Sequence, residues 1–416
     1  MRFAGVKLTI LFCILFCVGA RGQEHLVAVL EERTMAFDEQ LDSILVEFGD
    51  YVDIDKYKNA IEIARKRGRP ARFVAVEYRT VDPKGNPVVA SGLIAYPEKG
   101  KFRGTVEISP FAREKTHCGS RRVFSTECLA ANFGYVTLIP DTIGYGSSED
   151  LPIAYLMYEN SARVSADLRL AAKEYFAMTG DKAVPDKTVP DKAVSDKTVS
   201  DKTVPDKTVF FGYSLGAPGA LATAGYYHAH PEIGVKIKRV CIGSGPYSPV
   251  LALKNTVYKG EITYLIYPGI AKSVNSWLDL GLDYAKLFRG PVRDDFDIIT
   301  DGNTNLRVLA EKYGFKVQQY LCPDFFLPEK NEEIDRLMEG LTGLEIPYDG
   351  FSLPKNVRIN MLHGVEDMFV PVDCSDILYD KLKKDYPCTH YMRIPKVSHY
   401  ETAAISMVNL VFTVLL

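Results

Sequence analysis

The stretch TVFFGYSLGAP, residues 208–218, decides the fold and the chemistry expected of this chain. Its first four residues are apolar or β-branched and predict a buried strand, and a helix-compatible segment follows at 220–228. A Gly-x-Ser-x-Gly motif between a strand and a helix is typical of a nucleophile elbow, a strained turn that exposes the serine hydroxyl. Gly212 and Gly216 flank the turn because a side chain at either position would block close packing of the strand on the helix. Ser214 is therefore the candidate nucleophile.

The pentapeptide alone is a moderate signal. Average composition predicts about 0.1 chance occurrences in a chain of this length. The alternative is a tight glycine turn in which the serine has no chemical role. The flanking strand and helix favour the elbow.

Two further residues complete a pattern of acyl-transfer chemistry. A nucleophilic serine needs a base to take its proton, and the base needs a carboxylate that fixes its tautomer and stabilises its charge. Asp367 follows a predicted strand at 357–362, and His399 follows another at 389–394, just before the last predicted helix. The order Ser214, Asp367, His399 is that of acyl hydrolases with a nucleophile elbow. We therefore predict that these three residues form a catalytic triad.

Other acidic and imidazole side chains lie close by in the sequence. Asp373 or Asp376 could replace Asp367 as the carboxylate, in which case Asp367 would be a turn former. His363 is the rival histidine, but it precedes Asp367 by only four residues at a strand end, where a structural role fits better. We expect Glu366 to face solvent.

The oxyanion formed during acyl transfer needs two N–H donors. The first is expected from Leu215, directly after the serine. The loop after a predicted strand at 104–109 begins Pro110-Phe111-Ala112. Because proline has no N–H, either Phe111 or Ala112 must be the second donor.

The chain before these motifs is predicted to contain helices and a hairpin. Residues 23–71 show helical spacing of apolar residues, for example at Leu26 and Leu30, and we expect helices packed outside the main fold. Strand-like runs at 73–81 and 87–96, separated by turn residues, predict a β-hairpin.

A pentad of the form Asp-Lys-Thr/Ala-Val-Pro/Ser repeats from Asp181 and runs into the central strand at Asp206. A period of five fits neither helix nor strand, so we predict a solvated low-complexity loop at 181–205. Without this loop, a helix predicted at 158–178 would join the strand by an ordinary short connection. We interpret the repeat as an expanded turn without functional consequence; a binding arm is the alternative.

Residues 248–351 lose the alternation of strands and helices and hold helical patches joined by Pro and Gly. The segment is too long for a plain loop and predicts a cap inserted over the cleft. The predicted core is then formed by 72–247 and 352–416.

The N-terminus predicts export. In residues 1–22, Arg2 and Lys7 accompany an apolar run that is followed by small residues, as in a signal peptide. The run is too short to span a bilayer comfortably, so we predict a secreted or periplasmic protein without a stable membrane span after signal removal. An uncleaved anchor is the alternative.

Six cysteines follow this segment, and an even number in an exported chain allows disulfides. The local pairings Cys118–Cys128 and Cys374–Cys388 are the ones we expect. The sequence has no metal-ligand spacing such as Cys-x-x-Cys, so we expect neither a metal nor an organic cofactor. With 25% charged residues and a net charge of −3, the composition gives no indication of a nucleic-acid partner.

The motifs resemble those of the α/β-hydrolase superfamily over about residues 72–416, the repeat excepted. The shared patterns are Gly212-x-Ser214-x-Gly216, His363-Gly-x-x-Asp367-x-x-Val-Pro371, and His399 before a terminal helix. The resemblance implies an α/β-hydrolase fold: a mostly parallel central sheet flanked by helices, with an inserted, mainly helical cap. It also implies hydrolysis of carboxylic esters.

A narrower similarity is to the secretory lipase branch and its bacterial esterase-like relatives. It rests on Tyr78-x-Thr80…Gly85…Ala90-Ser91-Gly92…Pro97, followed by Pro140-Asp141-x-x-Gly144-Tyr145-Gly146. Where many relatives have His-Gly at the end of the oxyanion strand, this chain has Ser109-Pro110.

The sequence therefore predicts an exported serine esterase or lipase that cleaves a small-molecule or lipid-like ester through an acyl-enzyme. A peptidase or a carbohydrate-ester deacetylase on the same fold is a second hypothesis, because the cap and pocket, and not the triad, set the substrate. A non-catalytic hydrolase fold used for binding is a third.

Overall fold

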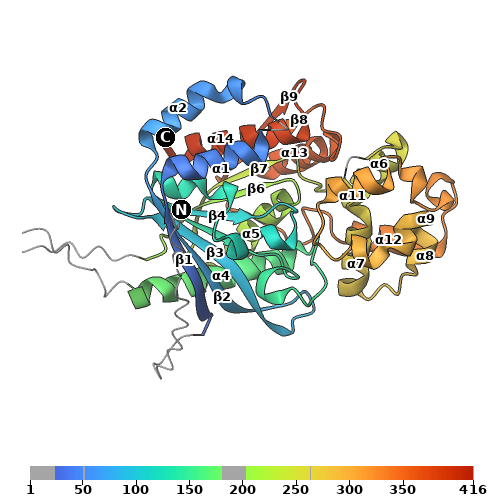
Figure 1. The fold of residues 1–416 in the computed structure, drawn as a ribbon, viewed down its shortest axis with the longest axis horizontal. Coiled ribbons are helices and arrows are strands. Elements are labelled where there is room, and N and C mark those ends of the chain that lie inside the picture. Colours follow the sequence, from blue (N-terminus) through green and yellow to red (C-terminus); the bar gives the residue numbers. More distant parts are fainter. Residues whose placement is uncertain (1–23, 50–51, 180–202, 263, 416) are drawn as a thin grey trace, which may run out of the picture.

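The computed structural model describes residues 24–49, 52–179, 203–262 and 264–415. In these residues a nine-stranded mixed sheet forms the centre of the molecule, with the order β1-β2-β3-β5-β4-β6-β7-β8-β9 (Figure 1). The first four strands in this order pair antiparallel: β1 (Leu26–Met35), β2 (Ala71–Val81), β3 (Pro87–Pro97) and β5 (Tyr135–Pro140). From β5 onward all pairs are parallel, through β4 (Gly104–Ser109), β6 (Lys207–Tyr213), β7 (Lys236–Gly243), β8 (Arg358–Gly364) and β9 (Thr389–Ile394).

Helices cover both faces of the sheet, which explains why the central parallel strands are short and apolar. One face packs against α4 (Tyr158–Thr179), α5 (Gly216–Ala229) and α13 (Asp373–Asp385). The other face packs against α1 (Phe37–Phe48), α14 (His399–Leu415), the 3₁₀ segment Thr126–Phe133 and the short α3 (Gly119–Arg122). The mostly parallel sheet flanked by helices and the predicted hairpin, now β2 and β3, are confirmed.

The N-terminal segment differs from the prediction. Residues 26–35, whose spacing predicted a helix, form β1 and pair along β2. Leu26 and Met35 are buried at its two ends, whereas Leu30 is 47% exposed. The pairing satisfies the backbone groups that β2 would otherwise present at an open edge, and this tertiary contact outweighs a weak helical pattern. Helices begin only afterwards, with α1 and α2 (Lys58–Arg67).

The predicted disulfides are wrong. Cys118, Cys128, Cys374 and Cys388 are free thiols, as are the two other cysteines in the described part of the chain. Burial raises the pKa of the Cys374 thiol to about 12 and that of the Cys118 thiol to about 11. Sequence proximity suggested the pairings, but buried thiols of this kind pack as small apolar side chains.

In the described residues, seven α-helices lie between β7 and β8 in the chain and gather at one end of the molecule, beside the sheet (Figure 1). They are α6 (Pro249–Lys259), α7 (Tyr267–Leu278), α8 (Tyr284–Leu287), α9 (Gly290–Asp294), α10 (Phe296–Ile299), α11 (Leu306–Tyr313) and α12 (Glu332–Thr342). We call this group the cap helices. α12 packs on α6, α7 and α8, so the cap helices have an apolar interior of their own.

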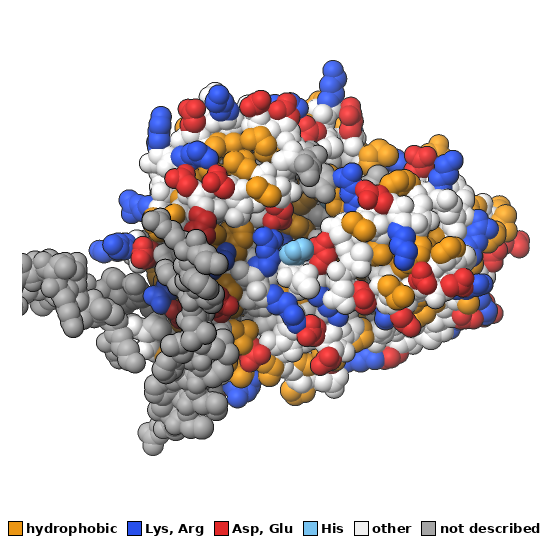
Figure 2. All heavy atoms as spheres, viewed as in Figure 1, with side chains coloured by type: hydrophobic (Ala, Val, Ile, Leu, Met, Phe, Trp, Pro, Cys, Tyr) orange, Lys and Arg blue, Asp and Glu red, His pale blue; other side chains and the backbone are white. Residues whose placement is uncertain are grey.

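Acidic and basic side chains are interspersed over the face drawn in Figure 2. No helix in the described ranges is both long and apolar enough to cross a membrane. The predicted export signal at 1–22 lies outside the described residues, as does most of the predicted repeat loop.

A buried ion pair ties α4 to the centre of the sheet. The side chain of Arg169 is fully buried and donates to Glu107 Oε1 on β4 at 2.5 Å. It also donates to the carbonyl oxygen of Pro205 at 2.6 Å, and the neighbouring Val204 is only 2% exposed. Val204 and Pro205, the end of the segment that the sequence assigned to the 181–205 loop, are thus part of the packed structure.

Because of this contact, we expect two deletions in the repeat to differ in their effect on stability. Deleting 181–200 removes four pentads and keeps the last one before β6, so we expect a free energy of unfolding within about 0.5 kcal/mol of the parent. Deleting 181–205 also removes Val204 and the carbonyl that accepts from Arg169, and we expect a loss of about 2–4 kcal/mol. Urea denaturation of the three proteins measures both effects. Equal stability of the two deletion variants would contradict the assignment of residues 204–205 to the core.

Candidate active site

Ser214 lies at a sharp turn between β6 and α5, at the carboxyl end of a strand in the middle of the parallel sheet. Its φ is +54°, in the left-handed region that few residues other than glycine adopt. A Cβ atom on Gly212 would lie 2.1 Å from the carbonyl oxygen of Gly216, and one on Gly216 would lie 2.0 Å from that of Ser109. Only glycine allows this turn, and the turn lies directly against the end of β4.

The three residues of the predicted triad come together. His399 Nε2 lies 3.0 Å from Ser214 Oγ, and His399 Nδ1 lies 2.6 Å from Asp367 Oδ2. The residues follow β6, β8 and β9, and parallel strands place their carboxyl ends at one edge of the sheet. Residues far apart in the sequence therefore form one hydrogen-bonded chain.

The carboxylate of Asp367 is buried, and both of its oxygens have hydrogen-bond partners. Its Oδ1 accepts the backbone N–H groups of Phe369 and Val370, each at 2.9 Å, while Oδ2 faces His399. Burial alone would raise the pKa of Asp367, but the adjacent His399 and His363 outweigh it and lower the pKa well below the ordinary value for aspartate. The carboxylate is therefore ionised when His399 needs a partner for its Nδ1 proton.

The rival residues have other partners. His363 Nδ1 lies 2.7 Å from Ser375 Oγ, and Nε2 lies 3.0 Å from the carbonyl oxygen of Val370 and 3.4 Å from Asp367 Oδ2. Both ring nitrogens are thus engaged behind the carboxylate, which is the structural role that the sequence favoured.

The other acidic residues contact different groups. Asp376 accepts from the Tyr391 hydroxyl at 2.9 Å and pairs with Arg393 at 3.5 Å, and Asp373 begins α13. Glu366 is exposed, as predicted. The structure thus places only Asp367, among these carboxylates, against His399.

Two aromatic residues that the sequence analysis did not single out fix the histidine. The Tyr213 hydroxyl donates to the backbone carbonyl of His399. The rings of Tyr213 and Phe369 each lie 4.9 Å from the imidazole, centroid to centroid. Their positions next to Ser214 and near Asp367 could have suggested this role, since neighbours of site residues commonly line the same site.

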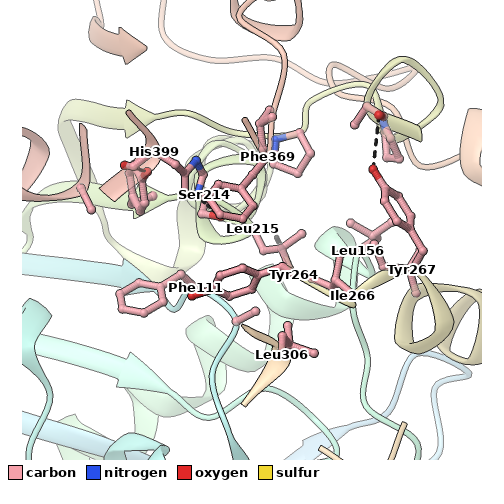
Figure 3. A pocket seen from close by; sticks show the side chains of 18 of the residues that line it. Phe111, Leu156, Ser214, Leu215, Tyr264, Ile266, Tyr267, Leu306, Phe369 and His399 are labelled. Atoms are coloured by element: carbon pink, nitrogen blue, oxygen red, sulfur yellow. Dashed lines mark hydrogen bonds between the residues drawn. The ribbon is translucent and has the colours of Figure 1, made fainter. Parts of the chain in front are cut away.

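The three residues that the sequence predicted as oxyanion donors line the cavity next to Ser214. Phe111 and Leu215 line the same cavity as Ser214 and His399 (Figure 3). Ala112 lines this cavity as well. The N–H groups of these three residues donate to no other described residue. An oxyanion hole requires N–H groups without another acceptor, so the predicted donors stay a prediction, with both Phe111 and Ala112 open as the second donor.

The cavity beside Ser214 has a volume of about 160 Å³ and a mainly apolar lining. Its walls come from the ends of the strands, from α14 and from the cap helices. In Figure 3, Tyr267 of α7 lies at the opposite end of the view from His399, with Ser214 and Leu215 between them. The Tyr267 hydroxyl bonds to Thr256 Oγ1 at 2.7 Å and to the carbonyl of Ala252 at 3.2 Å, so its polar end is satisfied within the protein.

A second, more polar hollow of about 370 Å³ adjoins the first. The two share Phe111, Ala112, Tyr264, Leu306 and Tyr400. The second hollow adds polar side chains from the loop after β4, among them those of Arg113, Glu114 and His117. Ser214 lines the apolar cavity, and the polar hollow adjoins that cavity at the residues that the two share. In the described part of the chain, no group of three His, Cys, Asp or Glu side chains could hold a metal ion.

Comparisons with known proteins identify the fold. No family model and no curated protein matches the sequence. Among solved structures, the rice cell wall degrading esterase LipA from Xanthomonas oryzae is similar, with a TM-score of 0.69 and 14% identity over 93% of this chain and 96% of that chain.

A candidate hydrolase from Legionella pneumophila has a TM-score of 0.65 at 17% identity, covering 94% of this chain and 98% of its own. Candida antarctica lipase A in its closed state has a TM-score of 0.58 at 12% identity, covering 94% of this chain and 83% of its own. At such low identity the likeness concerns the fold alone, and the chain has the α/β-hydrolase fold.

Proposed function

We propose that the protein is an exported serine hydrolase that cleaves carboxylic esters, as a lipase or carboxylesterase does. The observation that carries the proposal is the hydrogen-bonded chain from Ser214 through His399 to Asp367, beside a cavity with free N–H donors. The fold shared with an esterase and a lipase supports it. The signal-like N-terminal sequence supports export.

The geometry suits acyl transfer in two steps. Ser214 Oγ attacks the ester carbonyl carbon while His399 Nε2 takes its proton, and the carbonyl oxygen becomes an oxyanion held by the N–H of Leu215 and of Phe111 or Ala112. His399 then gives the proton to the leaving alcohol, which leaves an acyl-enzyme. Water, deprotonated by the same imidazole, attacks the acyl carbon and releases the acid. Asp367 fixes the histidine tautomer and stabilises the imidazolium.

The apolar lining of the first cavity and the polar lining of the second favour an ester with an apolar acyl chain as the substrate. An alkyl chain in the apolar cavity leaves no buried polar group of the protein unpaired, whereas a peptide or a sugar would lose its own hydrogen bonds there. The alcohol and the hydrolytic water would pass through the polar hollow. This arrangement favours an acyl ester over a peptide as substrate.

Replacing the nucleophile tests the reaction. We expect Ser214→Ala to lower kcat for p-nitrophenyl butyrate by about 10⁴-fold or more and to abolish labelling by a fluorophosphonate probe. Ser147→Ala is the matched control, because its hydroxyl is exposed and bonds to Glu77. Both variants should keep the parent circular dichroism spectrum. Ester hydrolysis that survives in Ser214→Ala would refute the proposal, and an unlabelled parent protein would favour a binding role.

The buried carboxylate gives a second test. Asp367→Asn should keep the fold but lower kcat by about 10³–10⁴-fold, because the amide NH2 would face Nδ1 and favour the wrong histidine tautomer, and a neutral amide does not stabilise the imidazolium. The folded-state pKa of Asp367 lies below the ordinary value, so its charge stabilises the fold above about pH 4, and this contribution is lost as the pH falls toward the folded-state pKa.

The free energy of unfolding should therefore fall less steeply from pH 4 to pH 2.5 in Asp367→Asn than in the parent. Denaturant titrations at each pH measure the slopes. Identical slopes would show that the carboxylate does not have the lowered pKa.

The apolar cavity gives a third test. Ala252 of α6 and Leu341 of α12 line it from the cap helices. Ala252→Leu should lower kcat/KM for p-nitrophenyl octanoate about tenfold relative to the acetate, and Leu341→Ala should raise kcat/KM for the laurate relative to the octanoate. The acetate is the internal control because its acyl group does not reach the cap helices. Unchanged ratios in both variants would place the acyl chain elsewhere.

A further inference from the structure

A buried cation next to the candidate oxyanion donors has no part in the triad or in the apolar cavity. Arg113 directly follows Phe111 and Ala112 in the loop after β4, and its side chain is only 10% exposed. A buried arginine is costly unless its charge and donors are paired, so its partners indicate what it holds.

The side chain of Arg113 folds back over the residue two positions earlier. Its guanidinium stacks on the Phe111 ring at 4.3 Å from the centroid. Its Nε lies 3.5 Å from the Phe111 carbonyl oxygen, the long end of the hydrogen-bond range. Both the ring and the peptide plane of Phe111 are therefore in contact with one rigid, planar group.

The other end of the guanidinium is anchored in the core. Arg113 Nη2 lies 2.5 Å from Glu127 Oε2, and Nη1 donates to Ser125 Oγ at 3.3 Å. Ser125 in turn donates to Glu127 at 2.7 Å, and the Glu127 side chain is 1% exposed. Glu127 belongs to the 3₁₀ segment that packs on β3, β5 and α14. The loop is thereby attached to the sheet through a buried, hydrogen-bonded ion pair.

The backbone of Arg113 is held as well. Its carbonyl accepts from the Tyr145 hydroxyl at 2.7 Å, and that hydroxyl lies 2.9 Å from the hydroxyl of Tyr155. The contacts therefore fix the residue before Ala112 and the residue after it. Neither contact uses the N–H of Phe111 or of Ala112.

We propose that Arg113, anchored by Glu127, is a positioning residue that holds the N–H donors of the 111–112 loop in place for the oxyanion. Oxyanion donors stabilise the transition state only when they are fixed before the reaction, and a displacement of about 1 Å can cost about 10²-fold in rate. The inference rests on the proposed ester hydrolysis and adds the group that preorganises its oxyanion hole.

Three variants and one control test this role. Arg113→Lys keeps a positive charge near Glu127 but loses the planar fork that contacts Phe111. Arg113→Met/Glu127→Met removes both buried charges, a change that commonly preserves stability in buried pairs. Glu127→Gln keeps the guanidinium but loosens its anchor. Arg33→Met is the control, because Arg33 lies 5.8 Å from the Phe124 ring and donates to Met35, outside the loop.

We expect Arg113→Lys and the double variant to lower kcat for p-nitrophenyl butyrate by about 10–100-fold, with KM within about threefold of the parent. Glu127→Gln should show a smaller loss of kcat, and Arg33→Met should keep the parent kcat. The rate of labelling by a fluorophosphonate, whose phosphoryl oxygen occupies the oxyanion position, should fall in parallel with kcat. Tm of each variant, measured alongside, separates a loss of fold from a loss of rate.

Parent kcat in a variant with parent Tm would overturn the inference. A loss that follows Tm across all variants, Arg33→Met included, would overturn it as well, because stability alone would explain the rates. These outcomes differ from a failure of the proposed function, in which the parent protein itself would neither hydrolyse the ester nor react with the probe.

Discussion

The close approach of the Ser214 turn to the end of β4 is the constraint on which the rest of the site depends. The carbonyl of Ser109 lies where a side chain on Gly216 would be, so the elbow and the following loop are in van der Waals contact. Leu215 of the elbow and Phe111 and Ala112 of the loop line one cavity at this contact. It also forces Ser214 into left-handed backbone geometry, which costs of order 1–3 kcal/mol and persists because the packing on both sides leaves no alternative.

Around that point, the strands of the sheet fix where the site residues lie, and the loops after the strands carry their functional side chains. The strands β4, β6, β8 and β9 are parallel, so the residues that follow them meet at one edge without any need for proximity in the sequence. Each charged group there is satisfied by partners deeper in the core: Asp367 by two backbone N–H groups and His363, and Arg113 by Glu127 and Ser125. The polar contacts behind the site fix the groups that would touch substrate.

Much of this site could be predicted from the sequence because each residue follows a strand with a clear apolar pattern. To predict Ser214, Asp367 and His399, it was enough to recognise the ends of the strands and the order of the three residues in the chain. The support for the site could not be predicted in the same way, since Glu127 and Ser375 lie in segments without a motif and act only through contacts that the fold creates. β1 was missed for a related reason: pairing along β2 is a tertiary effect, and the apolar residues of β1 are mostly exposed. The cysteine pairings failed because spacing in a sequence does not report distance in a fold.

The end of the pentad repeat that the structure describes connects directly to the strand that carries Ser214. The copies before Asp206 each end in Val followed by Pro or Ser, and the copy at 201–205 supplies Val204, which is buried, and Pro205, whose carbonyl accepts from Arg169. Adding or removing whole copies therefore leaves the same residues in front of β6 and does not change the register of the strand. A change in length before residue 201 would leave Val204 and Pro205 in front of β6, whereas an insertion between Pro205 and β6 would separate them from the strand; these two residues, and not the length of the repeat, therefore fix where the strand that carries Ser214 begins.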